Sequence, residues 1–279
     1  MTATSTEKLR VALVQYTGAV TIAENIRIVS PQVQQAVDGG AGMVFLPEVA
    51  NLVQRKAEAA RLEVTTETED PFLKTICDLA EQTSTWIHIG SLAVQPGDKD
   101  GRLANRGFLI DAKGAISARY DKIHMFDVAL SGGETYRESN TYRPGDRAVM
   151  ADTPWGKLGL TICYDMRFPH LYRDLASRGV SILTAPSAFT RKTGTAHWHT
   201  LLRARAIENS CFMIAAAQTG DHPDGRKTYG HSLVVDPWGE IIADQGTEPG
   251  VLFADLDLTA VDRVRTMIPS LNNNQTYRF

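Results

Sequence analysis

The sequence predicts an α/β protein built from mixed β-sheets. Short apolar segments typical of buried strands alternate along the chain with segments in which apolar residues recur at helical spacing. Several successive strands are joined by tight turns, which makes them antiparallel, so the sheets are not purely parallel. The chain has 279 residues and contains no linker-like segment, no low-complexity stretch and no repeat. We therefore expect one domain that spans residues 1–279.

The N-terminal half alternates strands and helices and then forms a hairpin. Apolar residues at helical spacing end at Gly39 and Gly40, which interrupt a helix. Residues 127–145 are rich in Gly, Ser, Asn and Pro, so we expect a long loop there. The predicted elements are a strand at 9–16, a helix from Ile22, a strand at 42–51 interrupted by Pro47, a helix-rich stretch to about residue 83, a strand at 86–94, and a hairpin of 102–111 with 115–124.

The C-terminal half repeats this alternation. The helix after Cys163 carries Pro169 near its start and Gly179 just past its end, which suits both of its ends. The predicted elements are strands at 157–163 and 180–189, a helix at 196–210, a strand at 211–218, a hairpin over 229–246 that turns at 236–239, a strand at 250–258, and a helix from Thr259.

Composition excludes several classes of protein. Hydrophobic residues make up 43% and charged residues 22%, with a formal net charge of −3 and a pI near 6.2, so a basic nucleic-acid footprint is missing. No apolar run approaches the roughly 20 residues that span a bilayer, so no membrane partner is expected. The N-terminus, MTATSTEKLR, lacks the apolar core of a signal peptide, and we expect a cytoplasmic protein.

Of the three cysteines, Cys163 occupies the position best suited to chemistry. Cys77 and Cys211 lie in apolar patterns, and the odd number without CxxC spacing argues against disulfides and zinc. Cys163 lies between a predicted strand and a helix, where helical N–H groups and the helix dipole favour a thiolate. The N–H of Tyr164 is placed to bind an oxyanion there. A buried packing cysteine remains the alternative from position alone.

A nucleophilic thiol needs a base, and the histidines supply no compact candidate. His197 and His199 are two residues apart on a predicted helix and face different directions, while His124 and His231 are isolated. Glu48 ends an apolar strand, where desolvation would raise its pKa toward a value useful for a base. Lys122 follows a hairpin strand, although for a lone lysine a solvated surface position is the commoner case.

Three segments together resemble a known family. FLPEVAN around Glu48, YDKIHMFD around Lys122 and GLTICYDMRFP around Cys163 resemble, in order and spacing, the Glu, Lys and Cys motifs of the nitrilase superfamily of carbon–nitrogen hydrolases. The resemblance extends over almost the whole chain, from VALVQ to ADLDL. It implies a four-layer α-β-β-α sandwich with two mixed sheets, with the three residues together at one end. It also implies a homodimer or larger homo-oligomer, with residues 168–179 and 196–210 at the interface, and no metal or organic cofactor.

The resemblance also implies catalytic roles. Cys163 attacks an amide carbonyl and forms a thioester, while Glu48 moves the protons. Lys122 and the N–H of Tyr164 stabilise the oxyanion, as a cation beside developing negative charge should. The family often has a second glutamate after the lysine motif, and Glu138 fits that pattern better than Glu134. Glu138 would hold Lys122 or orient the substrate, unless it is a solvated loop acid.

The remaining motifs resemble the branch that contains deaminated glutathione amidases and ω-amidases. Both classes release 2-oxoglutarate, from deaminated glutathione with Cys-Gly or from 2-oxoglutaramate with ammonia, so they differ on the leaving-group side. A dicarboxylic acyl group needs a cationic or donor-rich clamp. Arg167 is the first candidate, and an ion pair with Asp165 is the alternative role for it. Further candidates are Thr190, Arg191 and Thr195, in a predicted loop, and the aromatic residues Phe189 and Trp198.

Several alternatives remain open at the level of sequence. The thioester would serve acyl transfer if an amine replaced water. Nitriles and N-carbamoyl amino acids are other substrate classes of this superfamily. A protein that keeps the fold as an interaction module is the non-enzymatic alternative, which the complete Glu–Lys–Cys set disfavours.

Overall fold

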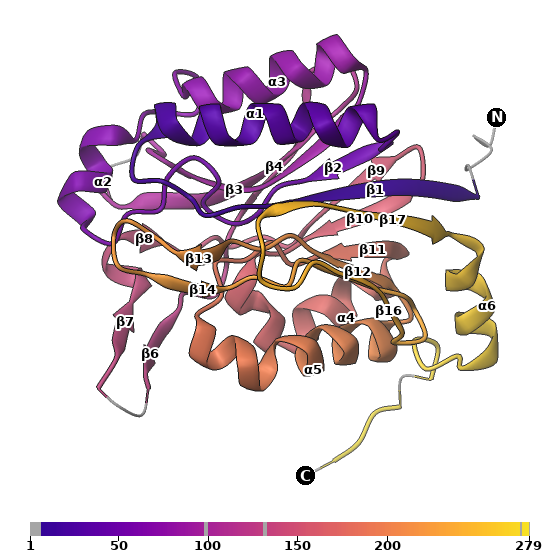
Figure 1. Ribbon diagram of the computed structural model, residues 1–279. Coiled ribbons are helices and arrows are strands. Elements are labelled where there is room, and N and C mark those ends of the chain that lie inside the picture. The colour runs from indigo at the N-terminus through magenta and orange to yellow at the C-terminus, as the bar shows by residue number, and fades with distance from the viewer. Residues whose placement is uncertain (1–6, 98–99, 131–132, 274, 279) are drawn as a thin grey trace.

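Two β-sheets pack face to face between two pairs of helices in the computed structural model, which describes residues 7–97, 100–130, 133–273 and 275–278 (Figure 1). Helices α1 (Ile22–Asp38) and α3 (Pro71–Thr83) cover the outer face of one sheet. Helices α4 (Pro169–Ser177) and α5 (Arg191–Asn209) cover the outer face of the other. The α-β-β-α sandwich expected from the sequence is confirmed.

The first sheet has seven strands and is mixed. β1, β2 and β3 are parallel neighbours, and the other pairs along the main path are antiparallel. β8 (Tyr142–Arg143) pairs with β4 outside that path. The order along the path is β17 (Gly250–Asp257), β1 (Lys8–Gln15), β2 (Met43–Phe45), β3 (Trp86–Val94), β4 (Leu103–Ile110) and β5 (Ile116–Asp121).

The second sheet has six strands, with a parallel centre and antiparallel edges. The predicted hairpin at 229–246 forms its β15–β16 edge. Its order is β16 (Ile241–Asp244), β15 (Leu233–Val235), β12 (Phe212–Ala215), β11 (Val180–Thr184), β10 (Gly156–Leu160) and β9 (Val149–Thr153).

Strand β1 shows why the layers stack in this order. Its side chains are buried on both faces, and alternate residues enter different cores. Leu13 belongs to the cluster that contains Leu160 of β10 in the opposite sheet. Val14 belongs to the cluster formed with Val33 of α1 and Ile76 of α3. An apolar strand without polar alternation therefore becomes the interior of a four-layer structure.

Two predicted loops are wrong. Within residues 127–145, the described part forms the hairpin of β6 (Asp127–Ala129) and β7 (Thr135–Arg137), a 3₁₀ turn over Glu138–Asn140, and β8. These strands are only two or three residues long, which is too short for a strand pattern to be recognised among the polar turn residues around them. Helix α5 starts at Arg191, five residues before its predicted start, because the Thr190 hydroxyl accepts from the Thr193 N–H and caps an opening turn that has no apolar pattern.

The helices expected at a subunit interface keep most of their apolar side chains inside the chain. Tyr172, Trp198 and Leu202 are fully buried in this single subunit, Leu201 is half-buried, and Ile207 is exposed. Their apolar character is therefore explained by packing on the second sheet. Shorter elements complete the fold: α2 (Ala57–Glu63), β13 (Thr219–Asp221), β14 (Lys227–Tyr229) and α6 (Thr259–Met267). Every helix in the described part of the chain is too short or too polar to cross a membrane.

Candidate active site

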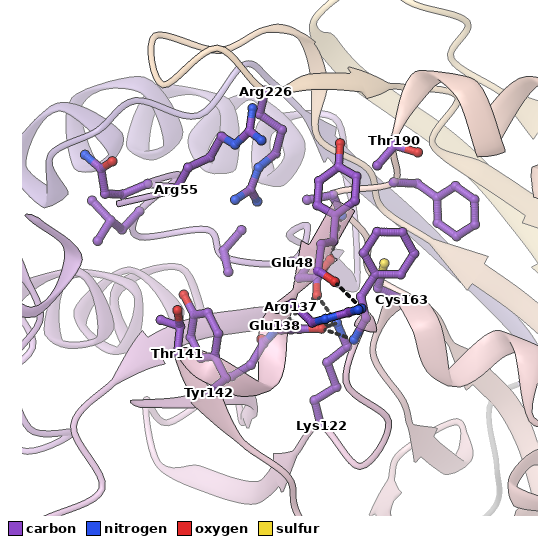
Figure 2. Close-up of a pocket in the computed structure, with 18 of the residues that line it drawn as sticks. Glu48, Arg55, Lys122, Arg137, Glu138, Thr141, Tyr142, Cys163, Thr190 and Arg226 are labelled. Atoms are coloured by element: carbon purple, nitrogen blue, oxygen red, sulfur yellow. Dashed lines mark hydrogen bonds and ion pairs between the residues drawn. The ribbon is translucent and has the colours of Figure 1, made fainter. Parts of the chain in front are cut away.

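Three strand ends bring Glu48, Lys122 and Cys163 into one pocket. Glu48 follows β2, Lys122 follows β5 and Cys163 follows β10, so both sheets contribute. The pocket has a volume of about 230 Å³, just below the roughly 300–1,000 Å³ typical of small-molecule sites. Figure 2 shows the three residues with Glu138 beside them. The residues that the sequence predicted as catalytic are thus neighbours in space.

Lys122 forms a buried ionic cluster with two glutamates. Its Nζ lies 2.8 Å from Oε1 of Glu48 and 2.9 Å from each carboxylate oxygen of Glu138. Its side chain is 2% exposed. Burial alone would lower the pKa of Lys122, but the charges of Glu138 and Glu48 hold it well above its ordinary value. Lys122 is therefore a fixed cation and not a proton carrier.

Glu48 is paired, contrary to the unpaired acid expected from the sequence. Its Oε2 accepts from the Ala188 N–H at 2.7 Å, and its Oε1 accepts from Asn105 Nδ2 at 3.0 Å as well as from Lys122. Burial raises the pKa of Glu48, but the charge and hydrogen bond of Lys122, with the Ala188 N–H, bring it below its ordinary value. The predicted rise in pKa is wrong, and Glu48 is ionised at neutral pH.

Cys163 is a neutral thiol in this structure, although a thiolate was expected. Burial raises its pKa well above the ordinary value, the charge of Glu48 raises it further, and Lys122 offsets only part of this. The residue opens a five-residue 3₁₀ turn, Cys163–Arg167, and the longer helix α4 begins only at Pro169. The helix dipole invoked for a thiolate is therefore not at the sulfur. Cys163 also has φ of +49°, an uncommon left-handed conformation for a side chain with a Cβ.

Asp165 fixes the cysteine turn against the lysine strand. One of its carboxylate oxygens accepts from the Tyr120 hydroxyl at 2.7 Å and from the Ile162 N–H at 2.8 Å. The other accepts from His124, at 3.0 Å from the backbone N–H and 2.7 Å from Nδ1. Tyr120 and His124 flank Lys122, and Ile162 precedes Cys163. Asp165 therefore positions the sulfur relative to the ammonium group, and it does not pair with Arg167.

Glu138 lies where the family pattern predicted it. Its Oε2 accepts from the Phe126 N–H at 2.6 Å, in addition to its contacts with Lys122. Glu134 is exposed at the β6–β7 turn and does not line the pocket. Asn105, which sequence reasoning missed, donates to Glu48 and, at 3.2 Å, to Glu138. The signal that could have found it is an amide side chain next to Arg106 in a strand whose other residues are apolar or glycine.

The predicted substrate-binding residues divide into two groups. Phe189 and Thr190 line the pocket. Tyr164, Arg167 and Thr195 are not among its lining residues. The Arg167 guanidinium lies 3.1 Å from Nδ1 of His197 and 5.6 Å from the centre of the Phe189 ring. Thr195 lies in the second turn of α5 and donates to the Arg191 carbonyl, because the predicted loop is helical.

Three arginines that the sequence analysis did not identify also line the pocket. They are Arg55, Arg137 and Arg226, from the segment before α2, from β7 and from the turn before β14. Tyr142 of β8 also lines it, and burial raises its pKa to about 12, while Arg226 opposes that rise. Arg55 lies four residues after the first family motif, whereas Arg137, Tyr142 and Arg226 lie ten or more residues from any of the three motifs. Only the arrangement of the loops around the strand ends brings them together.

A second cluster of ionisable groups lies outside the pocket. His231 was predicted to be isolated, but its Nδ1 lies 2.9 Å from Oδ1 of Asp244, and Nε2 of His199 lies 2.9 Å from Oδ2. The prediction failed because the β15–β16 hairpin brings Asp244 back beside His231. All three ligand atoms lie within 4.8 Å of one another, a grouping able to hold a metal ion, and the hydrogen bonds to Asp244 account for it equally well.

Comparison with known proteins extends these observations. The sequence profile of the carbon–nitrogen hydrolase family matches residues 10–266. The chain is 38% identical over 266 residues to the deaminated glutathione amidase of Yersinia enterocolitica, covering 95% of this chain and 92% of that protein. It is 40% identical over 272 residues to a Schizosaccharomyces pombe protein named probable hydrolase nit2, covering 95% and 98% of the two chains.

A solved structure agrees with the fold. Saccharomyces cerevisiae Nit3, described as a member of branch 10 of the nitrilase superfamily, superposes with a TM-score of 0.85 at 29% sequence identity. The match covers 95% of each chain. The likeness therefore spans nearly the whole of both chains.

Proposed function

This chain belongs to the carbon–nitrogen hydrolase family, and from that premise we propose that its pocket is the active site of an amidase that works through a thioester on Cys163. The observation that carries this proposal is the buried Glu48–Lys122–Glu138 cluster in the same pocket as a buried thiol. A buried ion pair alone is weak support for stability, so its position beside a nucleophile favours a catalytic role.

Acylation needs one proton transfer and one stabilised charge. The thiol proton of Cys163 passes to Glu48 as the sulfur bonds to the amide carbon, so a free thiolate never has to accumulate. The carbonyl oxygen becomes an oxyanion that accepts hydrogen bonds from Lys122 and from the Tyr164 N–H. When this intermediate collapses, the C–N bond breaks and the leaving nitrogen takes the proton from Glu48.

Deacylation uses the same groups with water in place of the thiol. Glu48 removes a proton from the water as its oxygen attacks the thioester carbon. The C–S bond then breaks, the acid leaves, and the sulfur recovers its proton from Glu48. Because Lys122 keeps its charge throughout, it contributes an electrostatic field that needs no reorganisation between the two halves.

For the substrate we favour deaminated glutathione, cleaved to 2-oxoglutarate and Cys-Gly. Proteins of that name are similar over nearly the full chain. The 2-oxo acid carboxylate would bind where α5 begins, because Thr190 caps that helix at the pocket and helix N-termini favour anions. Phe189 would pack on the acyl chain. The side chains of Tyr164, Arg167 and Thr195 do not line the pocket, so we assign them no direct contact with the substrate; only the backbone N–H of Tyr164 acts, on the oxyanion.

The second candidate is ω-amidase activity on 2-oxoglutaramate, because the acyl group is the same. Acyl transfer to an amine and hydrolysis of N-carbamoyl amino acids remain alternatives for the same thiol. A non-catalytic interaction module is disfavoured, because the pocket is open and its ionic cluster is complete.

Initial rates on four compounds test the proposal. Deaminated glutathione, 2-oxoglutaramate, an N-carbamoyl amino acid and a simple nitrile are compared at equal concentration, with Cys163→Ala as the blank. We expect deaminated glutathione to give the highest kcat/KM. A hundredfold preference for the nitrile or the carbamoyl compound, equivalent to about 2.7 kcal/mol in the transition state, overturns the substrate assignment. Added amines that divert product from 2-oxoglutarate would reveal acyl transfer.

We expect a homodimer or larger homo-oligomer in the cytoplasm. Ile207 at the end of α5 is 50% exposed and Trp238 in the β15–β16 turn is 48% exposed. A Cβ placed on Gly239, next to Trp238, would contact Ile207, so the two form one apolar patch. Free cysteines suit a reducing compartment. Light scattering on the purified protein and on Trp238→Glu tests the assembly, and a wild-type monomer would refute it.

A further inference from the structure

The pocket is lined by more cationic side chains than the proposed amidase mechanism requires. Two anionic side chains line it, Glu48 and Glu138, and Lys122 is bonded to both. The three arginines that also line it have no carboxylate partner within the pocket. Among the described residues, no carboxylate lies within ion-pair distance of Arg55 or Arg137, and the Arg137 guanidinium bonds only to the carbonyl of Tyr136. This surplus charge is available to an anionic ligand.

Arg226 is the most enclosed of the three. Its side chain is 24% exposed, and its Nε lies 3.8 Å from Oδ2 of Asp224, which is itself 2% exposed. This contact orients the Nε edge of the guanidinium toward Asp224. No acceptor among the described residues bonds to the Nη edge. Arg226 lines the pocket, and its two Nη atoms are therefore available to bind a carboxylate with two parallel bonds.

Arg55 approaches the same region from another element. It is exposed, and its guanidinium lies 5.9 Å from the centre of the Tyr136 ring, which also lines the pocket. In Figure 2, Arg55 and Arg226 lie to the left of the Glu48 carboxylate, whereas Cys163 and Thr190 lie to its right. The arginines and the start of α5 therefore occupy different parts of the pocket.

We propose that Arg226, assisted by Arg55, is a subsite for a carboxylate at the far end of the leaving group. This inference rests on the proposed function and adds the feature that separates a dipeptide from ammonia as the leaving group. Deaminated glutathione carries one carboxylate on its acyl part and one on its terminal glycine. The start of α5 would bind the carboxylate of the acyl part. Arg226 and Arg55 would bind the carboxylate of the terminal glycine. 2-Oxoglutaramate has no group that would reach them.

The size of the cavity supports this division. A volume of about 230 Å³ suits the acyl group and the reacting amide, but the end of a dipeptide must reach the rim. The exposed Arg55 lies at this rim. Charge-assisted hydrogen bonds at a partly buried guanidinium discriminate better than contacts with exposed side chains. Arg226 should therefore contribute more to selection than Arg55.

The experiment compares three substrates with one acyl group: deaminated glutathione, its C-terminal amide, and 2-oxoglutaramate. The variants are Arg226→Met, Arg55→Met, and Arg61→Met as a control that removes an exposed charge of α2 that does not line the pocket. Arg226→Met leaves Asp224 buried and unpaired, so Arg226→Met with Asp224→Asn is a second variant. Calorimetric binding of the acid and the amide to Cys163→Ala, with and without Arg226→Met, adds a readout without turnover.

We expect the wild type to prefer the acid over its C-terminal amide by about tenfold or more, as a charge-assisted bond implies. Arg226→Met should remove that preference in both kcat/KM and binding, and should leave 2-oxoglutaramate unaffected. Arg55→Met should reduce the preference partly, and Arg61→Met should not change it. Equal losses on all three substrates, or no loss on any, overturn the subsite while the proposed function stands. Absence of turnover and of binding for every 2-oxoglutaramyl amide overturns both.

Discussion

Glu138 holds the Lys122 ammonium group with both of its carboxylate oxygens, each 2.9 Å from Nζ. The same ammonium group lies 2.8 Å from a single oxygen of Glu48. Two carboxylates therefore bind one ammonium group, Glu138 through both oxygens and Glu48 through one. This division keeps Lys122 in place with the ammonium group on Oε1 of Glu48 only, so that Oε2, which accepts from the Ala188 N–H, stays clear of the cation for the proton that Glu48 has to accept during catalysis.

Replacing Glu138 with Gln should lower kcat by about tenfold to a hundredfold, less than the roughly 10²–10³ seen when an oxyanion donor is removed outright. The amide has no charge and only one acceptor oxygen, so Lys122 would bind Glu48 more tightly. The base would then be held in its ionised form and the ammonium group displaced. Steady-state kinetics check this prediction, and KM should change less than kcat.

The matched control for that variant is Glu134→Gln. Glu134 is the other acid that the sequence offered, and it is exposed at the β6–β7 turn. Its replacement should leave kcat unchanged. Equal effects of the two variants would show that the loop, and not the Glu138 carboxylate, supports Lys122.

The sequence predicted that Glu48, Lys122 and Cys163 share one pocket because each of them lies within a short motif. Glu48, Lys122 and Cys163 each follow a strand, and the order of the motifs constrained them jointly. The pKa directions were not predictable in the same way. They depend on the 2.8 Å contact of Lys122 with Glu48 and on the Ala188 N–H, which lies far along the chain. The local sequence indicated that Glu48 is desolvated, which raises its pKa. It did not indicate the groups that lower this pKa again.

The substrate-facing residues were the least predictable part of the site. Arg226 lies in the turn before β14, where nothing local distinguishes it from a solvated arginine. The bridge between Thr228 and Thr190 holds this turn, while the Arg226 side chain lies on the Arg55 side of Glu48, away from Thr190 (Figure 2). Thr195 was misplaced for the opposite reason, since the polar opening turn of α5 looked like a loop.

Cys163→Ala should abolish turnover and leave the protein folded. The change removes one sulfur atom from a side chain that is 7% exposed, which costs about 1 kcal/mol of unfolding free energy. Cys211→Ala is the matched control because Cys211 is equally buried, with its thiol donating to the carbonyls of Val180 and Asn209. That variant should lose stability and keep its kcat. Urea denaturation and product assays separate the two effects, and residual turnover by Cys163→Ala would refute the nucleophile.

Glu48→Gln should stop acylation and lower the pKa of the Cys163 thiol. Glutamine cannot take the thiol proton, so no burst of product should appear on mixing. Its neutral side chain also removes the negative charge that helps to raise the pKa of the thiol, while Lys122 remains. The rate of alkylation by iodoacetamide should therefore rise with pH at lower values than in the wild type. A shift to higher pH, or a product burst, would contradict the base assignment.

Buried His88 should make the protein less stable in mild acid. Burial lowers its pKa from 6.5 to about 3, and its Nδ1 has no hydrogen-bond partner in the described part of the chain. Below pH 6.5 the unfolded chain binds a proton at this position that the folded protein excludes, so falling pH favours unfolding until about pH 3. Between pH 7 and pH 5 this amounts to a loss of about 2 kcal/mol. Urea denaturation at both pH values should show a loss about 2 kcal/mol smaller in His88→Leu than in the wild type and in His170→Asn, whose imidazole is exposed; the buried His222, whose pKa is also lowered, accounts for part of the loss that remains. Because the free energy of unfolding is compared between two pH values within each variant, the intrinsic effect of the leucine on stability cancels. An unchanged loss in His88→Leu would assign the acid sensitivity to other groups.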